Sequence, residues 1–224
     1  MRLALFPSFF YRRDAASGEL CGVGIEIGRA FAQGLGVVLA PSEHPSPPAV
    51  VAALVSGTAD IALLGIDPAR AEAVDFSPPL FAADFTYLVP EGSPVHAVAD
   101  ADRRGMRIAV VRHHAMDTVL RGQLKAAAPA YADTPEAAFD LLRAGQADVL
   151  AGIRPGLLTY ADALPGARVL AGRFGRNVIA LAVRRGEPSW LVTVGEFAAR
   201  ARLDGTVTRA VASAGLQGVD AAAD

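Results

Sequence analysis

The chain has 224 residues, of which 52% are hydrophobic and 20% charged, and its formal net charge is −2. This length allows one large or two small domains with sizeable cores, and the composition excludes intrinsic disorder. The charge gives no indication of binding to nucleic acid or an acidic membrane, the single cysteine (Cys21) excludes an intrachain disulfide and a cysteine-based zinc site, and no apolar run reaches transmembrane length.

The first 80 residues alternate between strand and helix patterns. The apolar run at 59–66 is typical of a strand covered on both faces, and the helix before it has Pro47 at its start and Gly57 after its end. The alternation predicts a parallel sheet with helices on both sides. Strands are expected at 2–6, 36–43 and 59–66, and helices at 22–36 and 47–57.

After an extended segment at 85–95 the same alternation starts again. The segments "AVVAALVSGTADIALLGI" (49–66) and "AAFDLLRAGQADVLAGI" (137–153) share one order: helix, glycine turn, Ala-Asp, strand. Two similar α/β lobes with a ligand cleft between them are therefore predicted, and the alternative is one doubly wound sheet. Strands are expected at 105–112, 130–132, 147–153, 167–172 and 177–186, and helices at 115–128, 134–145, 155–164 and, as a closing pair, within 188–215.

Six segments occur in an order that resembles a known family: "RDAASGELCGVGIEIGRAFAQGLG", "VVAALVSGTADIALLGIDPARAEAVDFSPPLF", "YLVPEGSPV", "GMRIAVVR", "AAFDLLRAGQADVLAG" and "LAVRRGEPSWLVTVGEFAARARLDGTV". They resemble the family 3 extracellular solute-binding proteins, which are amino-acid receptors of the type II periplasmic-binding fold. "TYLVPEGSPV" and "RVLAGRF" are similar to a bacterial subgroup described as transporter substrate-binding domain proteins. The resemblance implies a two-lobed (Venus flytrap) α/β fold with two crossover segments, in which 1–86 plus 179–224 form lobe 1 and 87–178 form lobe 2.

Arg70 matches the arginine whose guanidinium holds the ligand carboxylate in this family. A planar, permanently charged fork suits that task, and the alternative is a surface arginine at a helix start. The preceding segment departs from the family and offers only Gly65, the backbone of Ile66, and Asp67. Asp67 either accepts a hydrogen bond from a ligand amine or caps the turn that begins at Pro68.

The loop after the first strand carries Ser8, Phe9 and Phe10, where the resemblance implies an aromatic side chain packed on the ligand. Phe9 or Phe10 is expected as one wall of the cleft, and the alternative for either ring is a core position.

In lobe 2, "VVRHHAMD" stands where the family has a ligand-binding helix start, and backbone N–H groups at such a start attract a carboxylate. Arg112, His114 and Ala115 are the expected ligand contacts, unless they are solvated loop residues. A metal site at His113 and His114 is not expected, because adjacent histidines rarely face one ion and no third ligand is evident.

The resemblance implies that receptors for α-amino acids keep an acid just after the strand segment matching "ADVLAG" (147–152), where it pairs with the ligand ammonium. This chain has Ile153 and Arg154 there. An unpaired buried ammonium is costly, so the departure argues against an ordinary α-amino acid. Arg154 indicates an anionic ligand group or else faces solvent, and Arg173 and Arg176 would make the cleft more positive.

These observations favour a binding protein, without cofactor, metal or catalysis, that captures a small carboxylate-bearing metabolite (an organic acid or an amino-acid-like compound) for ABC-type uptake. Lobe closure would trap the ligand, and the same movement would serve a sensor. The rival is a cyclohexadienyl or arogenate dehydratase, which needs a general acid, and no glutamate is expected near the cleft.

The expected partners are the ligand and an ABC permease, with no nucleic acid, and the chain is expected to be a monomer. An effector domain of a transcriptional regulator is disfavoured, because no helix-turn-helix precedes the first lobe. The family implies a periplasmic or extracellular location. No signal peptide is recognisable at the start of the chain, which leaves the cytoplasm open as the alternative.

Overall fold

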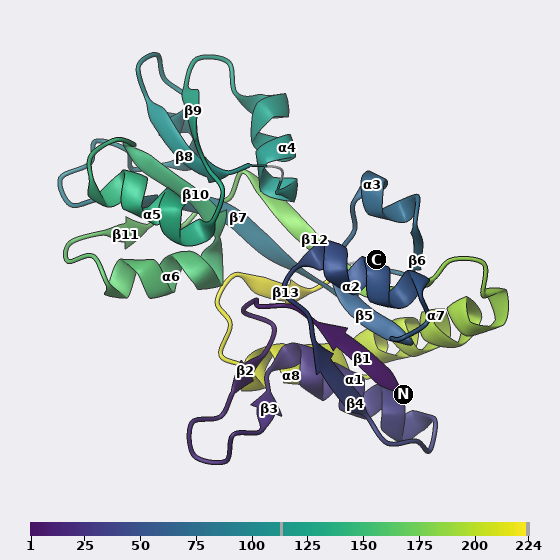
Figure 1. Ribbon diagram of the computed structural model, residues 1–224. Coiled ribbons are helices and arrows are strands. Elements are labelled where there is room, and N and C mark those ends of the chain that lie inside the picture. The colour runs from purple at the N-terminus through teal and green to yellow at the C-terminus, as the bar shows by residue number, and fades with distance from the viewer. Residues whose placement is uncertain (113, 223–224) are drawn as a thin grey trace. The chain divides into compact units, whose positions relative to one another are not determined.

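The computed structural model describes residues 1–112 and 114–222 (Figure 1). The chain forms two compact units: unit 1 is Met1–Ala82 with Val178–Asp224, and unit 2 is Ala83–Asn177. Each boundary falls inside a strand, the first in β7 (Phe81–Val89) and the second in β12 (Gly175–Arg184). The chain therefore passes from one unit to the other along two strands rather than through loops.

Unit 1 contains a sheet in which β1 lies between β4 and β5 and is parallel to both. β12 is antiparallel to β5, and β6 is antiparallel to β12. The strands of unit 1, besides β12, are β1 (Arg2–Leu5), β2 (Arg12–Arg13), β3 (Leu20–Cys21), β4 (Ala40–Glu43), β5 (Ile61–Gly65), β6 (Val74–Phe76) and β13 (Val219–Ala221), and its helices are α1 (Val23–Gly34), α2 (Pro47–Val55), α3 (Pro68–Ala71), α7 (Pro188–Leu203) and α8 (Thr206–Ser213).

All five residues of β5 are buried, as the continuous apolar run predicts for a strand covered on both faces. Between α1 and α7 the core is aromatic. The Phe31 ring, 2% exposed, stacks on Phe197 at 4.4 Å and on Trp190 at 5.5 Å between ring centroids. Such pairs add to the free energy gained by burying the rings.

Unit 2 repeats the arrangement, with β8 between β9 and β10 and parallel to both, and with β7 antiparallel to β10. Alternate residues of β8 enter two cores: Ile108 and Val110 pack in one cluster with Met116 of α4, and Ala109 and Val111 in another with Phe139 of α5. Helices therefore cover both faces. The strands are β8 (Arg107–Val111), β9 (Ala128–Ala132), β10 (Val149–Ile153) and β11 (Arg168–Val169), and the helices are α4 (Ala115–Gln123), α5 (Pro135–Arg143), α6 (Arg154–Asp162) and the 3₁₀ helix η1 (Val98–Ala101).

One polar clamp occurs in both units and accounts for the repeated Ala-Asp of the sequence. In unit 1 Asp60 accepts from the backbone N–H of Arg2 and pairs with its guanidinium. In unit 2 Asp148 accepts from the N–H of Arg107 at 2.8 Å and from its Nη2 at 2.7 Å. The arginine hydrogen bond is the main cause that lowers the pKa of each aspartate. Each clamp joins the starts of two parallel neighbouring strands, β1 with β5 and β8 with β10.

The predicted α/β class and the parallel sheets flanked by helices are confirmed, but several boundaries were wrong. The helix expected at 115–128 ends at Gln123, because the Asp102 carboxylate accepts from three consecutive backbone N–H groups, those of Lys125, Ala126 and Ala127, and β9 starts at Ala128. The strand expected from residue 36 begins only at Ala40. The β2–β3 hairpin, α3 and β6 were not predicted.

Candidate ligand-binding residues

The segment that carries Arg70 follows the carboxyl end of β5 in unit 1. Asp67, in extended conformation, caps α3 by accepting from the backbone N–H groups of Ala69 at 2.9 Å and Arg70 at 3.3 Å, and Pro68 occupies the first helical position. Capping is one of the two roles predicted for Asp67; a role toward a ligand amine stays a prediction. The cap fixes the backbone from which the Arg70 side chain extends.

The Arg70 side chain is half-buried and turns back to the strand that precedes it. Its Nη1 donates to the carbonyl of Gly65 at 2.9 Å. Burial lowers the pKa of Arg70, and the charge of Asp67 opposes that shift. Within residues 1–112 and 114–222, no carboxylate forms an ion pair with Arg70. The backbone N–H of Ile66 is used by the fold, since it donates to the carbonyl of Val178 at 2.8 Å.

The two phenylalanines after β1 differ in burial. Phe10 is 4% exposed and meets the edge of Phe81 at 5.3 Å between centroids, which is the core position given as the alternative. Phe9 is half-buried and packs on Phe10 at 4.3 Å. Ser8 accepts weakly from the backbone N–H of Phe10, at 3.4 Å. Phe9 is therefore the ring with surface to offer a ligand.

In unit 2, the start of α4 carries the expected contacts Arg112, His114 and Ala115. The exposed Arg112 guanidinium lies 4.7 Å over the Tyr131 ring, with its Nε 3.5 Å from Asp133. His114 is exposed at the N-cap position, and Ala115 opens the helix. The neighbouring His113 lies outside the described residues. In the part of the chain that the structure describes, no three His, Cys, Asp or Glu side chains are grouped to hold a metal.

Arg154, the first residue of α6, does not face solvent, so that alternative was wrong. Its side chain is 12% exposed, and its Nε is 3.5 Å from the Asp84 carboxylate. The two terminal nitrogens donate to the carbonyls of Leu170 at 2.7 Å, Ala171 at 2.8 Å and Gly172 at 3.0 Å. Arg154 therefore ties the start of α6 to the segment 170–172, a role that its local sequence does not reveal.

Asp84 is the charged residue that sequence reasoning missed. It lies in β7, whose nine residues are all buried, and is 7% exposed. Nitrogens of Arg154, Arg173 and Arg176 each lie 3.5 Å from its carboxylate oxygens, and its Oδ1 has no hydrogen-bond partner. The signal was present in the sequence, since Asp84 is the one charged residue in "FAADFTYLV".

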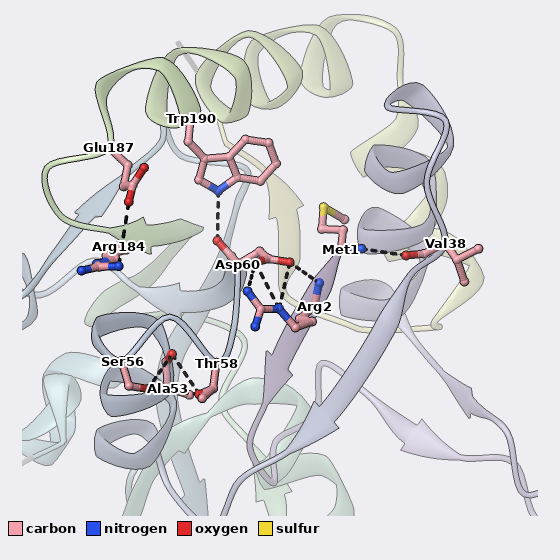
Figure 2. Close-up of polar contacts among 10 residues, drawn as sticks. All are labelled: Met1, Arg2, Val38, Ala53, Ser56, Thr58, Asp60, Arg184, Glu187 and Trp190. Carbon is pink, nitrogen blue, oxygen red and sulfur yellow. Dashed lines mark hydrogen bonds and ion pairs between the residues drawn. The ribbon is translucent and has the colours of Figure 1, made fainter.

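A concavity of about 600 Å³ lies in unit 1 where β1 and β5 begin, at the strand end opposite to that followed by Arg70. Figure 2 shows its polar contacts. Asp60 is held by Arg2, and the indole N–H of Trp190 donates to the Asp60 carbonyl at 3.0 Å. Since these groups already stabilise the fold, we do not assign the concavity to the ligand.

The sequence matches the bacterial extracellular solute-binding proteins, family 3, over residues 4–214. The chain belongs to this family. Comparison with curated proteins finds no match. Among the helices that the structure describes in this chain, none is long and apolar enough to cross a bilayer.

Solved structures show the same fold. An amino acid ABC transporter substrate-binding protein, AbpA from Streptococcus pneumoniae, bound to L-arginine, is 20% identical with a TM-score of 0.75 over 96% of this chain and 93% of that chain. A histidine kinase sensor domain with similarity to periplasmic binding proteins is 22% identical with a TM-score of 0.78 over 99% and 97%. An ancestral amino-acid-binding protein, a precursor of cyclohexadienyl dehydratase, is 24% identical with a TM-score of 0.73 over 95% and 93%. The type II periplasmic-binding fold predicted for this family 3 chain is thereby confirmed.

Proposed function

We propose that this family 3 protein binds a small carboxylate-bearing metabolite and delivers it to an ABC-type permease. Units 1 and 2 are the two lobes in this proposal, and the protein acts as a monomer in the periplasm or outside the cell. The observation that carries the proposal is the state of Arg70. Its guanidinium is half-buried and held by the Gly65 carbonyl, and in the described part of the chain no carboxylate pairs with it.

A partly desolvated cation that no carboxylate contacts directly is unfavourable in a folded protein, and the charge of Asp67 only partly offsets the burial of Arg70. A ligand carboxylate removes this cost by forming charge-assisted hydrogen bonds with the guanidinium fork. The Asp67 cap and the Gly65 hydrogen bond hold the side chain in advance, so little conformational entropy remains to be lost on binding. Phe9, on the same unit, is proposed to supply an apolar wall.

The ligand is proposed to be an organic acid in preference to an ordinary α-amino acid. Ile153, the last residue of β10, and Arg154, the first of α6, occupy the position where the resemblance implies an ammonium-pairing acid. Arg112, His114, Ala115 and Arg154 remain proposed contacts of unit 2. The similar structure with bound L-arginine supports an amino-acid-like ligand as the alternative.

Two other functions have a specific observation in their favour. The similar histidine kinase sensor domain supports sensing. The similar ancestral amino-acid-binding protein is described as a precursor of cyclohexadienyl dehydratase, which makes a dehydratase on the same fold the other alternative. An adjacent permease gene would favour transport over sensing. Turnover of prephenate or arogenate by the purified protein would establish catalysis and contradict the proposal of a binding protein.

The binding proposal is tested by mass spectrometry of small molecules that remain bound through purification, followed by calorimetry with matched organic acids and amino acids. Arg70→Ala is expected to weaken binding of a carboxylate ligand by roughly 2–5 kcal/mol, the cost of truncating one partner of a charge pair. Arg209→Ala is the matched control, because Arg209 also belongs to unit 1 and also donates to a backbone carbonyl, that of Asp204. Equal affinity in wild-type protein and Arg70→Ala would contradict the proposal.

A further inference from the structure

Unit 2 contains a charge cluster, formed by Asp84, Arg154, Arg173 and Arg176, in which arginines outnumber carboxylates. Even with Arg176 left aside, the single Asp84 carboxylate faces two guanidinium groups. The cluster lies beside the end of β10, because Phe85 pairs with Ile153 across the sheet and Arg154 follows directly. It therefore occupies the position where the resemblance implies an acid for the ligand ammonium.

The geometry shows that the Asp84 carboxylate makes only long contacts with these arginines. Its contacts with all three are 3.5 Å long, beyond the 2.7–2.9 Å or so that is usual for charge-assisted hydrogen bonds. The buried Oδ1 has no hydrogen-bond partner at all. The carboxylate thus attracts the guanidinium groups by charge, and its contact with Arg173 is too long for a charge-assisted hydrogen bond.

The arginines differ in how much the protein itself engages them. Arg154 is 12% exposed and donates to three backbone carbonyls, so it is part of the frame. The Arg173 side chain is 53% exposed, and its one polar interaction among the described residues is the 3.5 Å contact with Asp84. Arg173 is therefore the guanidinium with donors open to a ligand.

An ammonium would be poorly placed in this cluster. It would gain one attraction, to Asp84, and suffer a repulsion from each arginine already beside that carboxylate. An oxyanion has the opposite balance, with several attractions against one repulsion.

We propose that Arg173, positioned by Asp84 and the Arg154 frame, forms an oxyanion subsite on unit 2 that binds a second acidic group of the ligand, a carboxylate or a phosphate. The inference rests on the proposed function, since it concerns the same ligand. Arg173 is a specificity-determining contact, and Asp84 is a positioning residue that the ligand does not need to touch.

The test is calorimetry of the full chain with acids that differ by one acidic group. Malonate, succinate, glutarate and phosphoglycolate are each compared with the acid that lacks the second group: acetate, propionate, butyrate and glycolate. At least one diacid is expected to bind tenfold or more tightly than its partner. A preference among the dicarboxylates identifies a carboxylate subsite, and one confined to phosphoglycolate identifies a phosphate subsite.

Arg173→Ala is expected to reduce that ratio at least fivefold. Arg103→Ala is the matched control, because the Arg103 side chain is 54% exposed and also pairs with one aspartate, Asp100, in unit 2. Asp84→Asn keeps the shape of the side chain but removes its charge, and is expected to change the diacid-to-monoacid ratio while a monoacid binds as before.

Three results would overturn the inference: no diacid preference in wild-type protein, a preference unchanged by Arg173→Ala, or tight binding of neutral L-glutamine that is lost in Asp84→Asn. The last would show that Asp84 pairs with an ammonium. Failure of the proposed function is distinguishable, because it would appear as Arg70→Ala binding all the acids like wild-type protein. If Arg70→Ala bound neither monoacids nor diacids, but Arg173→Ala kept the wild-type ratio of diacid to monoacid affinity, only the subsite would be rejected.

Discussion

Replacing Arg154 by methionine tests whether this arginine holds unit 2 together. Methionine keeps much of the apolar stem but removes the hydrogen bonds that Arg154 donates to the carbonyls of Leu170, Ala171 and Gly172, and one ion-pair partner of Asp84. Asp84 keeps two arginines, and Thr86 still donates to the carbonyls of Leu170 and Gly172. We therefore expect the free energy of unfolding to fall by roughly 2–4 kcal/mol, toward the lower end of the range for breaking a buried ion pair.

Hydrogen-exchange mass spectrometry provides the assay, because the single tryptophan, Trp190, lies in unit 1 and its fluorescence reports on that unit. Amides of α6 and of the segment 168–172 are expected to exchange faster in Arg154→Met, while those of α7 are unchanged. Arg143→Met is the control, since Arg143 is exposed on α5, where it pairs with Asp140 at 3.4 Å and lies 5.7 Å over the Phe139 ring. If the free energy of unfolding falls by less than about 0.5 kcal/mol in Arg154→Met, the usual range for surface substitutions, the structural role of Arg154 is refuted.

Three further predictions follow from particular contacts. A Cβ on Gly152 would lie 2.7 Å from Leu157 Cγ, so Gly152→Ala is expected to cost roughly 1–3 kcal/mol by overpacking, seen as a lower thermal midpoint; an unchanged midpoint would contradict the packing of α6 on β10. Asp67→Ala is expected to remove about 1 kcal/mol of capping from α3 and to weaken carboxylate binding through Arg70, and affinity equal to wild-type would separate the cap from the binding role. The lowered pKa values of Asp60 and Asp148 mean that their stabilisation is present above the ordinary aspartate pKa of about 3.9 and is lost as pH falls through the folded values. The double variant Asp60→Asn/Asp148→Asn should therefore lose less stability than wild-type in urea titrations between about pH 5 and 3, by less than about 1 kcal/mol per clamp because both pairs are partly solvated.

The parts of the fold that the sequence predicted well are those encoded locally. The apolar run at 61–65 and the repeated Ala-Asp at 59–60 and 147–148 place β5 and β10 from nearest neighbours alone. The clamps at Asp60 and Asp148 were not predicted, because their arginine partners lie 58 and 41 residues away in the chain. The sequence also predicted helix starts where a capping residue precedes proline, such as Thr134 before α5.

The features missed depend on residues far apart in the chain. Asp102 ends α4 by binding backbone N–H groups more than 20 residues later, which no local helix pattern contains. Arg154 is buried because its guanidinium donates hydrogen bonds to backbone carbonyls of the segment 170–172, which lies 16 to 18 residues later in the chain. Asp84 is the exception, because one charge among eight uncharged residues of a buried strand is itself a signal, and a search restricted to glutamates passed over it.

The central claim, that Arg70 anchors a ligand carboxylate, is tested most directly by a crystal structure of the protein with the ligand that remains bound through purification, or with the acid that binds most tightly. If Arg70 binds the ligand, the carboxylate oxygens are expected about 2.7–2.9 Å from the Arg70 guanidinium nitrogens, the geometry of charge-assisted hydrogen bonds. A bound ligand without a carboxylate, or one whose carboxylate lies away from Arg70, would contradict it.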